Sequence, residues 1–108
     1  MGYLIHGNHE YAFEDRLLAH LKTVIGQKLL KQEGFFLSWT KTADEGSGRV
    51  SVWLSPHVTV AFRLGGDRIE LNPVWIRALA ALSHTQRGLV VVSEEEAEKY
   101  AKRAPDLI

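Results

Sequence analysis

The spacing of the apolar residues changes character within this chain of 108 residues and limits the folds open to it. Between residues 15 and 32 the apolar side chains recur three and four positions apart, which predicts one amphipathic helix. Its apolar stripe consists of Leu17, Leu18, Leu21, Val24, Ile25 and Leu29. From residue 35 to 64 the apolar residues instead alternate with polar ones, which is typical of strands with one buried face. The two periods together predict an α+β fold.

Turn and cap residues place the other elements. Gly7-Asn8 suits a tight turn and predicts a hairpin over residues 3–13. Asp15 is the expected N-cap of the first helix, and Gly34 its expected stop. Strands are predicted at 35–40, 50–54, 58–64 and 68–71. Because their connections are too short for crossovers, we expect them to form one antiparallel meander.

The remainder of the chain predicts helix, strand and helix. Asn72-Pro73 is a strong helix start, since an N-cap side chain precedes proline at the first helical position. The apolar run 89–92 is typical of a buried or central strand. Ser93 and Glu96 fit a capping box that opens a helix to about residue 103. We therefore predict a single α+β domain over residues 1–108 in the order ββαββββαβα.

Composition excludes several classes of function. The chain has no cysteine, which excludes a disulfide scaffold, a thiolate zinc site and cysteine catalysis. Its 13 basic and 13 acidic side chains balance, which argues against a binder of bulk nucleic acid or of anionic membranes. No apolar stretch reaches membrane-spanning length, and the first residues lack the pattern of a secretory signal. We expect a cytoplasmic protein without a cofactor and without a membrane partner.

Seven segments of the sequence resemble a family of short actinobacterial proteins of unknown function. They are MGYLI (1–5), DRLLAHL (15–21), FLSW (36–39), GSGRVS (46–51), WLSP (53–56), LNPVWI (71–76) and SHTQRGL (83–89). Members of that family often carry the automatic label "ATP-dependent DNA ligase". The resemblance thus implies a possible link to DNA ligation, which the residues themselves can test.

The adenylation chemistry of such a ligase needs a nucleophilic lysine in a K-x-D-G motif. Lys41, Asp44 and Gly46 supply these residue types at the wrong spacing, and the chain is too short for a nucleotidyltransferase domain plus an oligonucleotide-binding barrel. Ser55 and His57 would share a strand face but have no evident orienting acid. We therefore predict no catalytic residue and interpret the chain as non-enzymatic.

The histidines offer one weak metal hypothesis. His6 and His9 flank the predicted two-residue turn, which would place them opposite one another on the hairpin. Glu10 or His20 would have to supply a third ligand. Since two ligands do not make a site, we predict no metal and interpret the pair as solvated residues at the turn.

The second face of the predicted meander is the main candidate surface. If Val50, Val52 and Leu54 point to the core, Arg49 and Trp53 point away. The same alternation adds Arg63 and Phe36 to that face. An aromatic side chain flanked by arginines occurs both at the centre of protein interfaces and on sheets that stack single-stranded bases.

Three interpretations of this face remain open. The 73–83 or 93–103 helix could cover Trp53, a second copy or another protein could bind there, or the face could bind nucleic acid. We predict a protein contact, most simply a homodimer, through Phe36, Arg49, Trp53 and Arg63. The alternative is an accessory domain that binds nucleic acid, or associates with a DNA ligase, through Arg49, Trp53 and Arg63.

Overall fold

A computed structural model describes residues 1–41, 43–66 and 68–105. The strands are β1 (Gly2–His6), β2 (His9–Phe13), β3 (Phe35–Thr40), β4 (Arg49–Leu54), β5 (Val60–Arg63) and β6 (Leu89–Val90). The helices are α1 (Asp15–Leu30), α2 (Pro73–Ala81) and α3 (Glu94–Arg103). The α+β class and the order of the elements are confirmed, except that residues 68–71 form no strand. The predicted 1–108 boundary includes residues 106–108, which lie outside the described residues.

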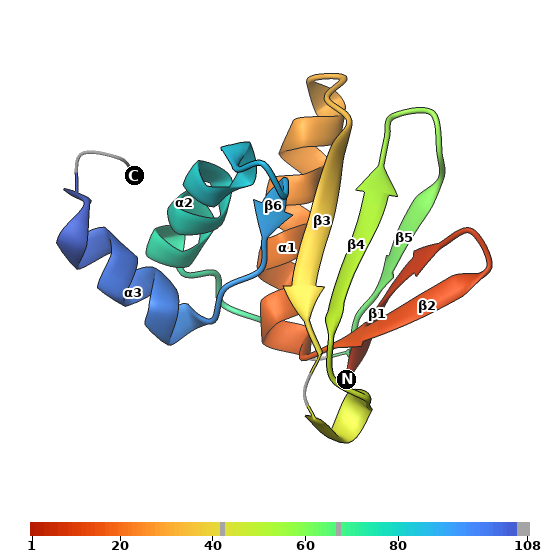
Figure 1. Cartoon of the computed structure of the whole chain (residues 1–108), viewed down its shortest axis with the longest axis horizontal. Coiled ribbons are helices and arrows are strands. Elements are labelled where there is room, and N and C mark those ends of the chain that lie inside the picture. Colours follow the sequence, from red (N-terminus) through yellow and green to blue (C-terminus); the bar gives the residue numbers. More distant parts are fainter. Residues whose placement is uncertain (42, 67, 106–108) are drawn as a thin grey trace.

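The predicted single meander is wrong, because the strands divide between two sheets (Figure 1). Sheet A has the order β2-β1-β5, and sheet B has the order β4-β3-β6. The β1–β2 and β3–β4 hairpins are antiparallel as expected. However, β5 leaves its chain neighbour β4 and pairs antiparallel with β1. A short connection therefore does not by itself keep two strands in one sheet. β3 and β4 pair across residues 41–48, whereas β4 and β5 do not pair across the shorter connection 55–59.

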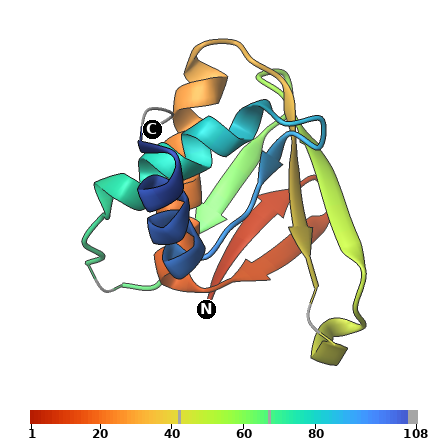
Figure 2. The same ribbon diagram turned by 60° about the vertical axis from the view of Figure 1, so that its left-hand side comes forward.

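The core lies between the inner faces of the two sheets and α1. Trp39 of β3 touches Phe13 and Tyr11 of β2, with ring centroids 5.0 and 5.3 Å apart, so the inner faces meet at one end. The apolar stripe of α1 fills the rest, and α2 packs between α1 and α3 (Figure 2). Fully buried leucines and isoleucine come from every layer: Leu4, Leu18, Leu21, Ile25, Leu37, Leu54, Leu79 and Leu89.

Two of the three predicted helix starts are confirmed. The Asn72 side chain accepts from the Val74 backbone N–H, and the Ser93–Glu96 capping box is complete. Asp15, by contrast, is the first helical residue and caps nothing in its own helix. Its carboxylate instead accepts from the Gly65 backbone N–H and pairs with the amino group of Met1.

The end of α1 also differs from the prediction. Gln32, not Gly34, adopts the left-handed conformation, with φ of 62°. The Glu33 N–H then donates to the Lys28 carbonyl and closes the helix. The apolar run 89–92 yields only two strand residues, which pair in parallel with β3 at the edge of sheet B instead of at its centre.

Candidate functional site

The outer face of sheet B, turned away from α1, carries the candidate binding residues. In the β3–β4 ladder, the Lys41 N–H donates to the Gly48 carbonyl at 2.8 Å. The Ser38 carbonyl, in contrast, accepts from Val91 beside β6. Because bonded and non-bonded pairs alternate, Phe36–Trp53, Ser38–Ser51 and Thr40–Arg49 are the non-hydrogen-bonded pairs, in which side chains approach most closely. We call these six residues, with Arg87 and Val90, the open face.

The aromatic end of the open face is the Phe36–Trp53 pair. Their rings meet edge to face with centroids 5.2 Å apart, yet Phe36 is 45% and Trp53 49% exposed. Gly34 lies against the indole, since a Cβ there would be 2.7 Å from Trp53 Cζ2. The helices lie on other sides of sheet B (Figures 1 and 2), so the interpretation in which a helix covers Trp53 is wrong.

A groove of about 360 Å³ adjoins the aromatic pair, between the end of α1 and the turn 85–88. Lys28 lines it, although this lysine is almost fully buried. Its Nζ donates to Ser83 Oγ at 3.1 Å, pairs with Glu33 at 3.4 Å and lies 5.2 Å from the centroid of Phe35. Lys28 is not among the predicted site residues, although its position four residues after Val24 places it on the apolar stripe of α1.

The middle of the open face is held by hydroxyl groups. Ser38 Oγ donates to the Arg87 carbonyl at 2.7 Å. Since its one hydrogen is used there, Ser51 is the donor in the 2.8 Å contact between the two serine hydroxyls. These bonds fasten the turn 85–88 to β3 and connect it to β4 through Ser38.

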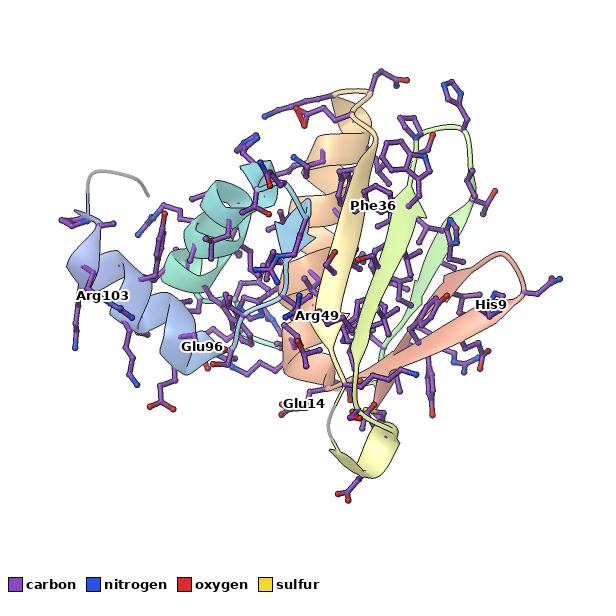
Figure 3. All side chains as sticks on the ribbon, viewed as in Figure 1. His9, Glu14, Phe36, Arg49, Glu96 and Arg103 are labelled. Carbon is purple, nitrogen blue, oxygen red and sulfur yellow. The ribbon has the colours of Figure 1, made fainter. Side chains whose placement is uncertain are left out.

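The polar end carries two arginines. Arg49 and Arg87 are exposed, and both line a small pocket of about 50 Å³ with Ser51 and Val90. Within the described part of the chain, neither guanidinium forms an ion pair with a carboxylate. Figure 3 shows Phe36 and Arg49 toward opposite ends of the sheet. Trp53 is four positions after Arg49, about 13 Å along the strand.

Arg63 does not belong to this face, contrary to the prediction. It lies on β5 in sheet A, with its guanidinium carbon 4.7 Å from the ring centroid of Tyr3 and a nitrogen 3.4 Å from a Glu10 oxygen. The alternation along residues 58–64 was interpreted as a continuation of β4, whereas the chain changes sheets at 55–59. Val58, the first residue of the predicted 58–64 strand, is 42% exposed in that turn.

His6 and His9 lie at the tip of the β1–β2 hairpin. His6 and His9 are directly opposed, as predicted. Neither proposed third ligand joins them, because Glu10 pairs with Arg63 and His20 is fully buried among the helices. Across the described ranges, no group of three suitable side chains could hold a metal. Ser55 Oγ accepts from the His57 backbone N–H at 3.2 Å and so serves the turn.

His20 belongs to a polar network that ties the helices together. Its Nε2 accepts from the Asn72 N–H at 2.8 Å, and its Nδ1 lies 2.6 Å from the Arg16 carbonyl. A backbone N–H can only donate and a carbonyl can only accept, so this geometry requires the neutral ring with its hydrogen on Nδ1. His20 therefore has a structural role.

Arg16 and Glu94 complete this network between α1 and α3. The guanidinium donates to both Glu94 oxygens, at 3.1 and 2.6 Å, and to the Glu70 carbonyl. The bonds from Arg16, and next from Asn72, lower the pKa of Glu94 to about 2, while the carboxylate raises the pKa of Arg16. This end of the molecule is internally satisfied, unlike the open face.

The fold and the open face define a small α+β domain with an exposed sheet surface and, in the described residues, no helix long and apolar enough to cross a membrane. The chain belongs to the family described as a domain of unknown function (DUF7882), whose model matches residues 1–94. That match ends at the first residue of α3. No curated protein and no solved structure matches the chain.

Proposed function

We propose that this domain is a non-enzymatic interaction module that forms a homodimer through the open face of sheet B. The exposed Phe36–Trp53 pair is the observation that carries the proposal. Side chains of this size are normally covered, and paired exposed aromatics are typical of the centres of interfaces. The contact residues are Phe36, Arg49 and Trp53.

The charge of the open face supports a contact with a protein. Arg49 and Arg87 flank apolar and hydroxyl groups, and arginine is enriched at interfaces while lysine is depleted. The K-x-D-G chemistry of a ligase has no counterpart in this sequence, and Lys28 is occupied by Ser83 and Glu33. We place the protein in the cytoplasm, where the absence of cysteine needs no explanation.

Sedimentation equilibrium of the purified protein tests the proposal. We expect a dimer with a Kd on the order of micromolar, and Trp53→Ala should raise that Kd by about 30-fold, the effect of a 2 kcal/mol hot spot. Leu30→Ala is the matched control, because Leu30 is 83% exposed on α1 and lies outside the open face. A wild-type protein that stays monomeric at about 100 µM would exclude a stable dimer.

The same face allows one alternative, a single-stranded nucleic acid stacked on Trp53. Arg87 would then be the second arginine beside Trp53, the role that the sequence predicted for Arg63. A monomer that binds a short oligonucleotide at low salt, with affinity that falls as salt rises, would favour this alternative over the dimer.

A further inference from the structure

The outer edge of β4 presents a row of backbone groups without a partner strand. In the β3–β4 ladder, Val50, Val52 and Leu54 direct their N–H and C=O groups to β3, since they form the hydrogen-bonded pairs. The N–H and C=O groups of Arg49, Ser51 and Trp53 therefore point away from β3. Sheet B ends at β4, and no described residue forms a strand pair on that side.

This edge lacks the features that usually protect one. β4 has six residues in unbroken register with β3, without proline or a bulge, whereas β6 at the other edge has two residues. Natural edge strands are commonly shortened, bulged or charged to prevent pairing with another chain. Along β4 the single charge is Arg49 at its start, and Ser51 at its middle is exposed.

We propose that the homodimer forms by antiparallel pairing of β4 with β4 of a second copy, across a two-fold axis at Ser51. The inference rests on the proposed function and places the contact at the β4 edge of the open face, where Arg49, Ser51 and Trp53 meet the partner strand and Phe36, on β3, does not. Only Arg49, Ser51 and Trp53 offer outward backbone groups. The two-fold register that uses all three pairs Ser51 with Ser51 and Arg49 with Trp53. Each of the three pairs exchanges two hydrogen bonds, and a shift by two residues leaves one pair unmade.

The side chains complement one another in this register. Arg49, Ser51 and Trp53 lie on one face of β4, so pairing places each Arg49 beside the Trp53 of the partner strand. A guanidinium within about 6 Å of an indole is attracted to its face. The dimer thereby gives each Arg49 an aromatic partner and each Trp53 a neighbour on the adjoining strand, twice by symmetry. It also joins the two copies of sheet B into one six-stranded sheet.

A single engineered cysteine tests the register, because the chain has none of its own. In the proposed dimer the Cα atoms of the two Ser51 residues are about 5.5 Å apart, within disulfide reach. Ser51→Cys should therefore form a covalent dimer under mild oxidation, seen on a non-reducing gel. Thr40→Cys is the matched control. It lies on the same face but one strand further from the axis, so its two copies are more than about 14 Å apart.

A proline variant tests the same edge without a cross-link. The Ser51 N–H points outward, so Ser51→Pro removes no backbone bond to β3 and suits an edge strand. It does remove the hydroxyl contact with Ser38, which Ser51→Ala removes as well. We expect a folded protein with a dimer Kd raised by at least about tenfold, while Ser51→Ala, which lacks only the hydroxyl, should dimerise normally. Circular dichroism would establish that both variants fold.

The outcomes separate the two proposals. If the wild-type protein is a dimer but the Ser51→Cys variant forms no cross-link, or if Ser51→Pro leaves the Kd unchanged, the edge pairing is overturned and the homodimer stays in place. A cross-link formed equally by Thr40→Cys would show random collision and would also overturn the edge pairing. A monomeric wild-type protein would overturn both.

Discussion

The outer faces of the two sheets both carry an arginine and an aromatic ring, but these side chains have different surroundings on the two sheets. On sheet A, Arg63 lies over Tyr3 and pairs with Glu10, so its charge and the ring are satisfied within the chain. On sheet B, Arg49 has no carboxylate partner among the described residues, and Trp53 is half exposed. The difference shows that an arginine and an aromatic ring on a strand do not by themselves mark a binding surface. The proposed surface on sheet B differs in that Arg49 lacks a carboxylate partner among the described residues and about half of Trp53 is exposed.

The largest predicted difference is in the stability lost when a turn glycine next to each sheet is replaced, Gly88 beside sheet B and Gly7 in sheet A's hairpin. Gly88 has φ of +79°, and a Cβ there would overlap the Phe36 carbonyl oxygen across the turn 85–88. Gly7 at the hairpin tip of sheet A has φ of +61° but open space around it. We expect Gly88→Ala to lower the free energy of unfolding by about 3 kcal/mol or more, and Gly7→Ala by about 1 kcal/mol. Urea unfolding of the two variants measures both; equal losses would contradict the close packing of the turn on β3.

The next predicted difference is between Arg49, which should affect the dimer Kd, and Arg63, which should affect the free energy of unfolding. Arg49→Gln should raise the dimer Kd about tenfold and change the unfolding free energy by less than about 0.5 kcal/mol. Arg63→Gln should leave the Kd unchanged and lower the unfolding free energy by about 0.5–1 kcal/mol, since it loses Tyr3 and Glu10. Sedimentation and urea unfolding of both variants check this. An equal effect of both on the Kd would mean that the two faces do not differ as the structure indicates.

The smallest predicted effect concerns acid and lies away from both faces. Because Arg16 lowers the pKa of Glu94 to about 2, the folded state binds this proton less readily than the unfolded state. The stabilisation that ionised Glu94 gives the folded state is therefore complete above about pH 5 and is lost as the pH falls toward 2. Thermal unfolding across this range should show a shallower acid loss for Glu94→Gln than for wild type.

Glu95→Gln provides the control for this titration. It removes the same charge from the same end of α3, but Glu95 pairs only with Lys99 at the surface. If both variants flatten the acid loss equally, the Arg16 contact is not its source.

Helix starts show how far local signals reach. Two helix starts were predicted correctly, those at Asn72-Pro73 and at Ser93–Glu96, because each cap forms its hydrogen bonds within four residues of itself. Asp15 has the right residue type, yet its carboxylate contacts Gly65 and Met1, which no local pattern reveals. Gly34 was interpreted as a helix stop, whereas its small size lets the Trp53 ring lie against it.

Of the four residues predicted to share one sheet face, three do so. Phe36, Arg49 and Trp53 share a face because β3 and β4 are a hairpin, whose alternation and register are local. Arg63 failed because its place depended on whether β5 stayed beside β4. Arg87 and Lys28 were missed since they reach the site through the turn 85–88 and the buried side of α1.

The sequence by itself determined the α+β class, the hairpins and two helix starts, because periodicity, turns and caps act over a few residues. Only the tertiary structure decided that the strands form two sheets, because β5 could pair either with its chain neighbour β4 or with the distant β1, and it pairs with β1. That pairing leaves the outer edge of β4 without a partner strand in the described part of the chain and places Arg63 in the other sheet. Long-range pairing depends on the shape of the whole core, in which the Trp39, Phe13 and Tyr11 rings hold the inner faces of the two sheets together.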